Sequence, residues 1–143
     1  MSAQPHPRPT GVGRLLVAVY AILAIAALGR SAFQIIDRFD EAPIAFSLSA
    51  VAAVVYVLAT LALAFGWDRL AWVTISFELA GVLVVGTLSV VAPEVLGLED
   101  ANPFGREATV WSAYGAGYLF IPLALPVLGI LWLRHRARTA VSA

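Results

Sequence analysis

Four long apolar stretches dominate this chain, at about 15–36, 43–65, 70–91 and 110–133. The hydrocarbon core of a bilayer is about 30 Å thick, and a helix needs about 20 apolar residues to cross it. Each stretch is long enough for a crossing. None of them alternates polar and apolar residues, which is the pattern of strands in a membrane barrel. The sequence therefore predicts an all-α fold, a four-helix transmembrane bundle.

The composition favours lipid over water as the surrounding solvent. Of the 143 residues, 61% are hydrophobic and 13% are charged, whereas soluble domains are about 45–50% apolar and about 25% charged. A soluble fold of this size has too small an interior for so much apolar surface. We expect a multi-pass protein of the cell (inner) membrane, in contact with membrane lipids. All nine basic residues are arginine, which indicates a GC-rich coding bias and a bacterial source.

The arginines outside the apolar stretches predict an orientation, because cytoplasmic connections carry an excess of Lys and Arg. Both tails and the turn between the second and third stretches share one side of the membrane. That side holds Arg8, Arg14, Arg69, Arg134, Arg136 and Arg138, and the other side holds Arg38 and Arg106. We therefore expect both termini to be cytoplasmic. Interfacial tryptophans fit this orientation, with Trp67, Trp72 and Trp132 near the inner boundary and Trp111 near the outer one.

The polar segments divide the chain into a disordered cytoplasmic tail at 1–12, a membrane domain at 13–134 and a basic cytoplasmic tail at 135–143. The first tail is rich in Pro and Gly, a composition that favours disorder. The inner turn at 66–69 is so short that the second and third helices must form an antiparallel hairpin. The one longer outer loop, at about 92–109, begins with a proline, which cannot continue a helix.

The first apolar stretch has a second interpretation. Arg14, the apolar residues after it and the segment 24–26 (Ala-Ile-Ala) resemble a signal peptide with a cleavage site. Cleavage after Ala26 would leave three spans in the same orientation. The helix-compatible run continues unbroken to Ile36, which favours retention of the segment.

Glu78 is the one carboxylate within the third stretch. It lies about 12 Å from the inner end of that helix, where a carboxylate is unfavourable by roughly 2.5–3.5 kcal/mol on insertion scales. It therefore needs protonation or a partner, with Ser47, Ser49, Thr60 and Tyr20 as candidates. A hydrogen-bonded Glu78 that ties helices together is the interpretation we favour. The alternative is a carboxylate that couples to protons or cations in a cavity.

Arg30 and Gln34 interrupt the first stretch in its outer third. With Asp37 and Glu41 they form one stripe, if the helix persists. Arg30 is expected either to extend to the outer headgroups beside an acidic partner or to line an outward-facing pocket for a lipid headgroup or small anion. A direct pairing of Arg30 with Glu78 is not expected, because their depths differ.

The fourth stretch begins with aromatic residues and then carries two prolines, Pro122 and Pro126. We expect Tyr114 in the outer aromatic belt, and a kink at each proline. Tyr118 and Pro122 are predicted to line the same outer pocket as the first helix. The candidate binding residues are therefore Arg30, Gln34, Glu78, Tyr114 and Tyr118.

Small residues within the spans favour close helix packing in lipid. Ala45, Ser49 and Ala53 follow at four-residue spacing in the second stretch, and Gly81 and Gly86 lie in the third. We expect them to pack inside the bundle, and a dimer seam is the alternative.

Several chemistries lack their residues in this sequence. There is no cysteine, and His6 and His135 both lie in the polar tails, so neither a thiolate nor a histidine metal site is expected in the bundle. No Ser/His/Asp set, nucleotide-binding loop or haem ligand pair can be assembled. We expect no enzyme activity, no catalytic residues, no cofactor, no metal and no nucleic-acid partner.

Four short segments resemble small four-span integral membrane proteins of actinobacterial type. These segments are 28–31 (Leu-Gly-Arg-Ser), 40–43 (Asp-Glu-Ala-Pro), 77–82 (Phe-Glu-Leu-Ala-Gly-Val) and 114–118 (Tyr-Gly-Ala-Gly-Tyr). The resemblance implies the four-span topology and no assigned activity. Four-span multidrug exporters of similar length also carry one membrane-embedded Glu, but in the first span, where this chain has Arg30. That difference argues against an exporter.

The sequence is compatible with two classes of function. The favoured one is a non-catalytic accessory or interaction subunit, which docks on a larger membrane complex or forms a homo-oligomer. The alternative is a small transporter or a lipid- or anion-binding membrane protein, which uses Glu78 and an outward-facing Arg30 pocket.

Overall fold

The computed structural model describes residues 11–41, 43–96 and 109–142. These residues form α-helices connected by short 3-10 helices, which confirms the predicted all-α class. The α-helices are α1 (Val12–Arg38), α2 (Pro43–Phe65), α3 (Asp68–Val91) and α4 (Ile121–Ser142), and the 3-10 helices are η1 (Phe39–Glu41), η2 (Pro93–Leu96) and η3 (Ser112–Tyr118). Most of the predicted tail at 1–12 and of the predicted outer loop at 92–109 lies outside the described residues.

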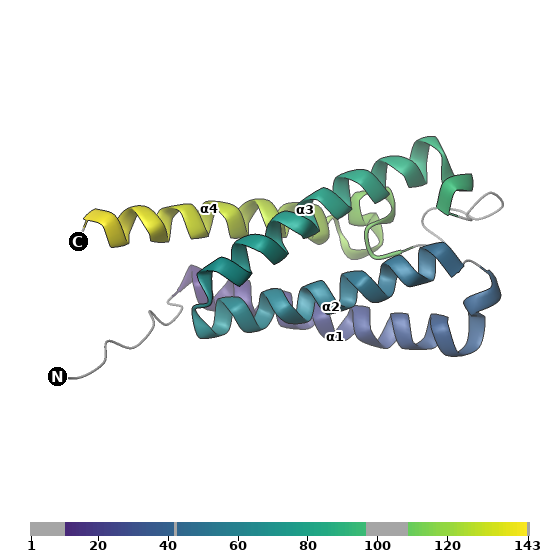
Figure 1. The fold of residues 1–143 in the computed structure, drawn as a ribbon, viewed down its shortest axis with the longest axis horizontal. Helices are drawn as coiled ribbons and strands as arrows, with labels where there is room; N and C mark the ends of the chain where they lie inside the picture. Colours follow the sequence, from purple (N-terminus) through teal and green to yellow (C-terminus); the bar gives the residue numbers. More distant parts are fainter. Residues whose placement is uncertain (1–10, 42, 97–108, 143) are drawn as a thin grey trace.

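The four helices pack together and alternate in direction along the chain (Figure 1). α1 lies along α2, α3 crosses α2 at an angle, and α4 contacts both α3 and α1. The start of α1, the turn between α2 and α3, and the end of α4 lie at one end of the bundle, while η1 and η2 lie at the other. The predicted antiparallel hairpin of the second and third helices is present.

Among the described helices, α1, α2 and α3 are long and apolar enough to cross a membrane. Their bounds agree closely with the first three predicted spans. These three helices suggest a multi-pass membrane protein.

The fourth helix differs from its prediction. The predicted span at 110–133 is α-helical only from Ile121, and the helix then continues through the predicted basic tail to Ser142. Its apolar part, 121–133, is about 20 Å long at 1.5 Å per residue, which is less than the roughly 30 Å of the hydrocarbon core.

The first part of the predicted fourth span is a compact turn built around η3. Left-handed backbone occurs at Ala113 (φ 48°), Tyr114 (φ 60°), Gly115 (φ 83°), Leu119 (φ 57°) and Phe120 (φ 59°). Two hydrogen bonds to serine hydroxyls hold this turn: the Thr109 N–H donates to Ser112 Oγ within the segment at 2.8 Å, and the Ala113 N–H donates to Ser89 Oγ of α3 at 2.8 Å. Glycine at 115 also accepts a positive φ without the usual steric penalty.

The two prolines have different roles in α4. Pro122 is the second residue of the helix, where its missing N–H needs no partner. A kink at Pro122 was therefore the wrong prediction. Pro126 lies inside α4, as expected.

Trp111, which was predicted near the outer boundary, does not have the exposed side chain of an interfacial tryptophan. Its side chain is only 1% exposed and belongs to the core. A Cβ atom on Gly81 would lie 2.6 Å from the Trp111 ring, and a Cβ on Gly86 would lie 2.5 Å from the Tyr114 ring. The two glycines of α3 thus leave the space that aromatic side chains from the η3 segment fill.

Candidate functional site

Glu78 of α3 lies inside the bundle and is completely buried. The Tyr20 hydroxyl of α1 donates a hydrogen bond to its Oε2 atom at 2.6 Å. Of the four candidate partners predicted from the sequence, Tyr20 is the one that the structure places here. Within the described part of the chain, Glu78 forms no ion pair with Arg30, and its Oε1 atom has no hydrogen-bond partner.

Aromatic side chains extend this contact into a small cluster. The Tyr20 and Tyr56 ring centroids are 6.3 Å apart, and the Tyr56 and Trp111 rings meet edge-on at 6.5 Å. The indole N–H of Trp111 donates to the Tyr56 hydroxyl at 2.9 Å. We call these four residues, Tyr20, Tyr56, Glu78 and Trp111, the polar centre.

Three helices and the residue before η3 contribute to the polar centre. Tyr20 comes from α1, Tyr56 from α2 and Glu78 from α3, while Trp111 precedes η3. α4 supplies Gly129, on which a Cβ atom would lie 3.1 Å from the Ile75 side chain and 3.5 Å from the Tyr20 hydroxyl. The lack of a side chain at 129 therefore allows α4 to pack closely over the Tyr20–Glu78 contact.

The chemistry of the polar centre is that of polar groups in an apolar interior. An isolated buried carboxylate is very costly, and a short hydrogen bond to it reduces that cost. Tyrosine and tryptophan are suited to this environment because each buries a large apolar ring and still offers one polar hydrogen. One hydrogen bond joins α1 to α3 and the other joins the η3 segment to α2, and the contact between the Tyr20 and Tyr56 rings connects the two pairs.

Arg30 and Tyr118 are the two predicted site residues that the structure brings together. The guanidinium carbon of Arg30 lies over the Tyr118 ring, 5.9 Å from its centroid, a cation–π geometry. Arg30 is half-buried on α1, and Tyr118 is half-buried at the end of η3. The expected proximity of Tyr118 to the first helix is therefore present.

The other predicted site residues have separate environments. Gln34 is only 1% exposed, which is unexpected for a residue of an open outer pocket. Tyr114 is half-buried, and its hydroxyl lies 2.9 Å from Thr87 Oγ1. Asp37 is exposed, and the side chain of Glu41 lies outside the described part of the structure.

Tyr56 and Trp111 are members of the polar centre that the sequence analysis missed. The sequence could have indicated Tyr56, because it is a single tyrosine among the small and aliphatic residues in the middle of α2. A buried tyrosine hydroxyl usually has a hydrogen-bond partner. Trp111 has no such signal, because an interfacial tryptophan would have the same local sequence.

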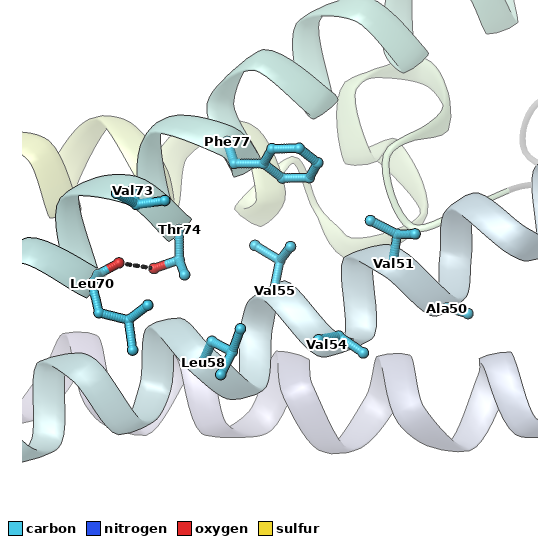
Figure 2. Close-up of a pocket in the computed structure, with 9 residues that line it drawn as sticks. All are labelled: Ala50, Val51, Val54, Val55, Leu58, Leu70, Val73, Thr74 and Phe77. Atoms are coloured by element: carbon cyan, nitrogen blue, oxygen red, sulfur yellow. Dashed lines mark hydrogen bonds between the residues drawn. The ribbon is translucent and has the colours of Figure 1, made fainter.

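An apolar groove opens between α2 and α3 (Figure 2). Its volume is about 470 Å³. It is lined by Ala50, Val51, Val54, Val55, Leu58, Leu70, Val73, Thr74 and Phe77. The one polar side chain among them, Thr74, donates its hydroxyl hydrogen to the Leu70 carbonyl at 2.9 Å, so the groove presents an apolar surface.

Comparisons with protein-family models, with curated proteins and with solved structures found no match to this chain. The resemblance to small actinobacterial four-span proteins therefore stays a prediction. In the described residues, no three His, Asp or Glu side chains gather in a way that could hold a metal ion. The geometry of the polar centre and of the groove is the basis on which a function can be inferred.

Proposed function

We propose that this chain is an integral protein of the bacterial inner membrane that acts without catalysis, as an accessory or interaction subunit. Its partner is a larger membrane complex or a second copy of itself. The observation that carries the proposal is the enclosure of Glu78, which is completely buried and hydrogen-bonded to Tyr20 at 2.6 Å. In this role the polar centre fixes α1, α2, α3 and η3 relative to one another.

An enclosed carboxyl group supports a structural role more than a transport role. Ionisable residues that carry ions or protons through membranes usually face a water-filled cavity or a relay of other ionisable groups. Glu78 instead contacts a tyrosine hydroxyl, and Gly129 allows α4 to close over that contact. The outer faces of the helices are rich in exposed aliphatic side chains, which suits contact with lipid and with partner helices.

The proposal includes an orientation, with four membrane-embedded helices and both termini in the cytoplasm. The start of α1, the α2–α3 turn and the end of α4 share one end of the bundle (Figure 1). That common end carries most of the arginines, which is typical of the cytoplasmic side. Because the apolar part of α4 is shorter than the hydrocarbon core, the η3 segment would occupy the rest of the fourth span within the bundle.

Proton flux in reconstituted vesicles tests the structural role of Glu78. We expect vesicles with the wild-type protein to acidify under an imposed potential no faster than protein-free vesicles. Glu78→Gln should fold normally, because the amide oxygen still accepts the Tyr20 hydrogen bond. Proton movement by the wild type that is lost in Glu78→Gln would overturn the proposal.

The second test of the proposal measures whether the chain associates with a membrane complex or with a second copy of itself. Crosslinking in cells, followed by purification in a mild detergent, should recover the chain in a fixed ratio with one membrane complex or with a second copy. A chain that is monomeric and uncrosslinked both in cells and in nanodiscs would contradict the interaction role.

A small transporter, or a lipid- or anion-binding protein, is the second candidate function. One observation favours it: the Glu78 Oε1 atom is buried with no hydrogen-bond partner among the described residues. Arg30 beside Tyr118 would provide the cationic group for an anion. This candidate predicts that Glu78→Gln or Arg30→Gln abolishes flux or anion binding while the fold is retained.

A further inference from the structure

A second hollow lies beside the apolar groove between α2 and α3, at the α2–α3 turn. The second hollow has a volume of about 570 Å³ and is lined by residues 66–70 and Val73. Leu70 and Val73 line both hollows. We call these two adjoining hollows together the α2–α3 groove, which extends from the turn to Phe77.

The length of the α2–α3 groove corresponds to one leaflet of a bilayer. From Arg69 to Phe77 the α3 axis advances about 12 Å, and from Leu58 to Ala50 the α2 axis advances about the same distance. Half of the hydrocarbon core is about 15 Å thick. Apart from Thr74, the side chains that line the first hollow are apolar (Figure 2), and the charged Asp68 and Arg69 line only the second hollow at the turn. The surface therefore matches a hydrocarbon chain that begins at the headgroup level and ends near the bilayer centre.

The end of the groove at the turn carries an available positive charge. Arg69 is exposed and makes no ion pair or hydrogen bond with the described residues. Its acidic neighbour, Asp68, lies 3.4 Å from the Arg136 guanidinium, so that carboxylate is already engaged. Trp67, which is 47% exposed, adds an indole ring of the kind that favours the headgroup level.

We propose that the α2–α3 groove binds one anionic phospholipid. An acyl chain lies along Leu70, Val73 and Phe77, and the phosphate contacts Arg69. A partner helix fits this surface less well, because a spanning helix needs a contact face through both leaflets, whereas the groove covers one leaflet and ends at a cation. The proposal depends neither on which side is cytoplasmic nor on the role of Glu78.

Native mass spectrometry of the full chain, released from nanodiscs of palmitoyl-oleoyl phosphatidylglycerol and phosphatidylcholine in equal amounts, tests the proposal. We expect one retained lipid, with phosphatidylglycerol favoured about fivefold, since one arginine near an anionic headgroup contributes about that factor. Arg69→Gln should remove this preference. Arg14→Gln, which removes an arginine from the same end but outside the groove, should keep it.

A groove-filling variant tests the acyl-chain contact independently of charge. Val73→Trp should fill the part shared by both hollows and reduce lipid retention several-fold. Val84→Trp is the matched control, since Val84 is also exposed on α3 but does not line the groove. Equal retention in Val73→Trp and wild type, or an unchanged lipid preference in Arg69→Gln, would overturn the proposal. A wild-type dimer that Val73→Trp dissociates would also overturn it, because a second copy would then occupy the groove.

Discussion

Two independent requirements place the Trp111 side chain. Its ring needs the space beside Gly81, and its indole N–H needs an acceptor, which the Tyr56 hydroxyl provides at 2.9 Å. At a membrane boundary, water would satisfy the same N–H, so the residue type alone could not distinguish the two positions. The buried position of Trp111 depends on contacts with Gly81 and Tyr56, which are far away in the sequence, so it could not be predicted from the local sequence.

Replacement of Trp111 by phenylalanine should therefore destabilise the bundle. The change removes the donor to Tyr56 and leaves a void, and we expect a loss of about 1–3 kcal/mol in the free energy of unfolding. Unfolding in mixed micelles at increasing SDS fraction would measure it. Trp67→Phe is the control at an exposed position, with an expected change within about 0.5 kcal/mol. Equal losses in both variants would show that Trp111 is not held as described.

At the scale of elements, α3 and the η3 segment fit together through glycines. Gly81 and Gly86 lie under the rings of Trp111 and Tyr114, while the Ser89 hydroxyl accepts the Ala113 N–H. The small residues of the third span were expected to pack inside the bundle, and here they receive side chains from an irregular segment.

Gly81→Ala should separate α3 from the η3 segment. The new methyl group would overlap the Trp111 ring, and overpacking of this kind typically destabilises a protein by about 1–3 kcal/mol. Gly29→Ala offers a matched control, because a Cβ there meets no atom within 4 Å and alanine raises helix propensity by about 0.5–1 kcal/mol. In detergent, the thermal unfolding temperature should therefore fall in Gly81→Ala and rise in Gly29→Ala. A stable Gly81→Ala variant would contradict the packing.

The first three helices could be predicted from the sequence because each is a long, mostly apolar run with polar residues at its ends. The fourth could not, since its apolar run includes a segment with left-handed residues that is held by a long-range contact, the hydrogen bond from the Ala113 N–H to Ser89 of α3. Glu78 could be recognised as a buried group because its charge interrupts an apolar run. Its partner could only be narrowed to a few candidates, because the choice depends on how α1 packs against α3.

At the scale of the whole molecule, the start of α1 and the end of α4 lie at the same end of the bundle (Figure 1). The contact of Asp68 at the start of α3 with Arg136 near the end of α4, at 3.4 Å, joins two elements there. The Asp68 side chain is 56% exposed, and ion pairs with a solvent-exposed partner contribute about 0–1 kcal/mol, so this pair adds little stability. Its importance is that the basic end of α4 lies beside the α2–α3 turn, as an orientation with both on the cytoplasmic side requires.

Single cysteines test this orientation cleanly, since the natural chain has none. Glu94→Cys in η2 and Ala137→Cys near the end of α4 are both at exposed positions and at opposite ends of the bundle. In intact spheroplasts, a membrane-impermeant thiol reagent should label the cysteine at 94, and it should label the cysteine at 137 only after permeabilisation. The reverse pattern would invert the orientation, and labelling of both without permeabilisation would contradict the membrane assignment.

The proposed structural role of Glu78 requires that its hydrogen bond from Tyr20 stabilises the bundle. A double-mutant cycle with Tyr20→Phe and Glu78→Leu, read as the free energy of unfolding in mixed micelles, tests it most directly. Each single change leaves a buried polar group without its partner, whereas the double change removes both groups. Couplings between membrane helices average about 0.6 kcal/mol and reach about 1.7. A short, fully buried bond should lie in the upper part of this range, at about 1 kcal/mol or more. Single losses that add within about 0.3–0.5 kcal/mol would contradict the claim.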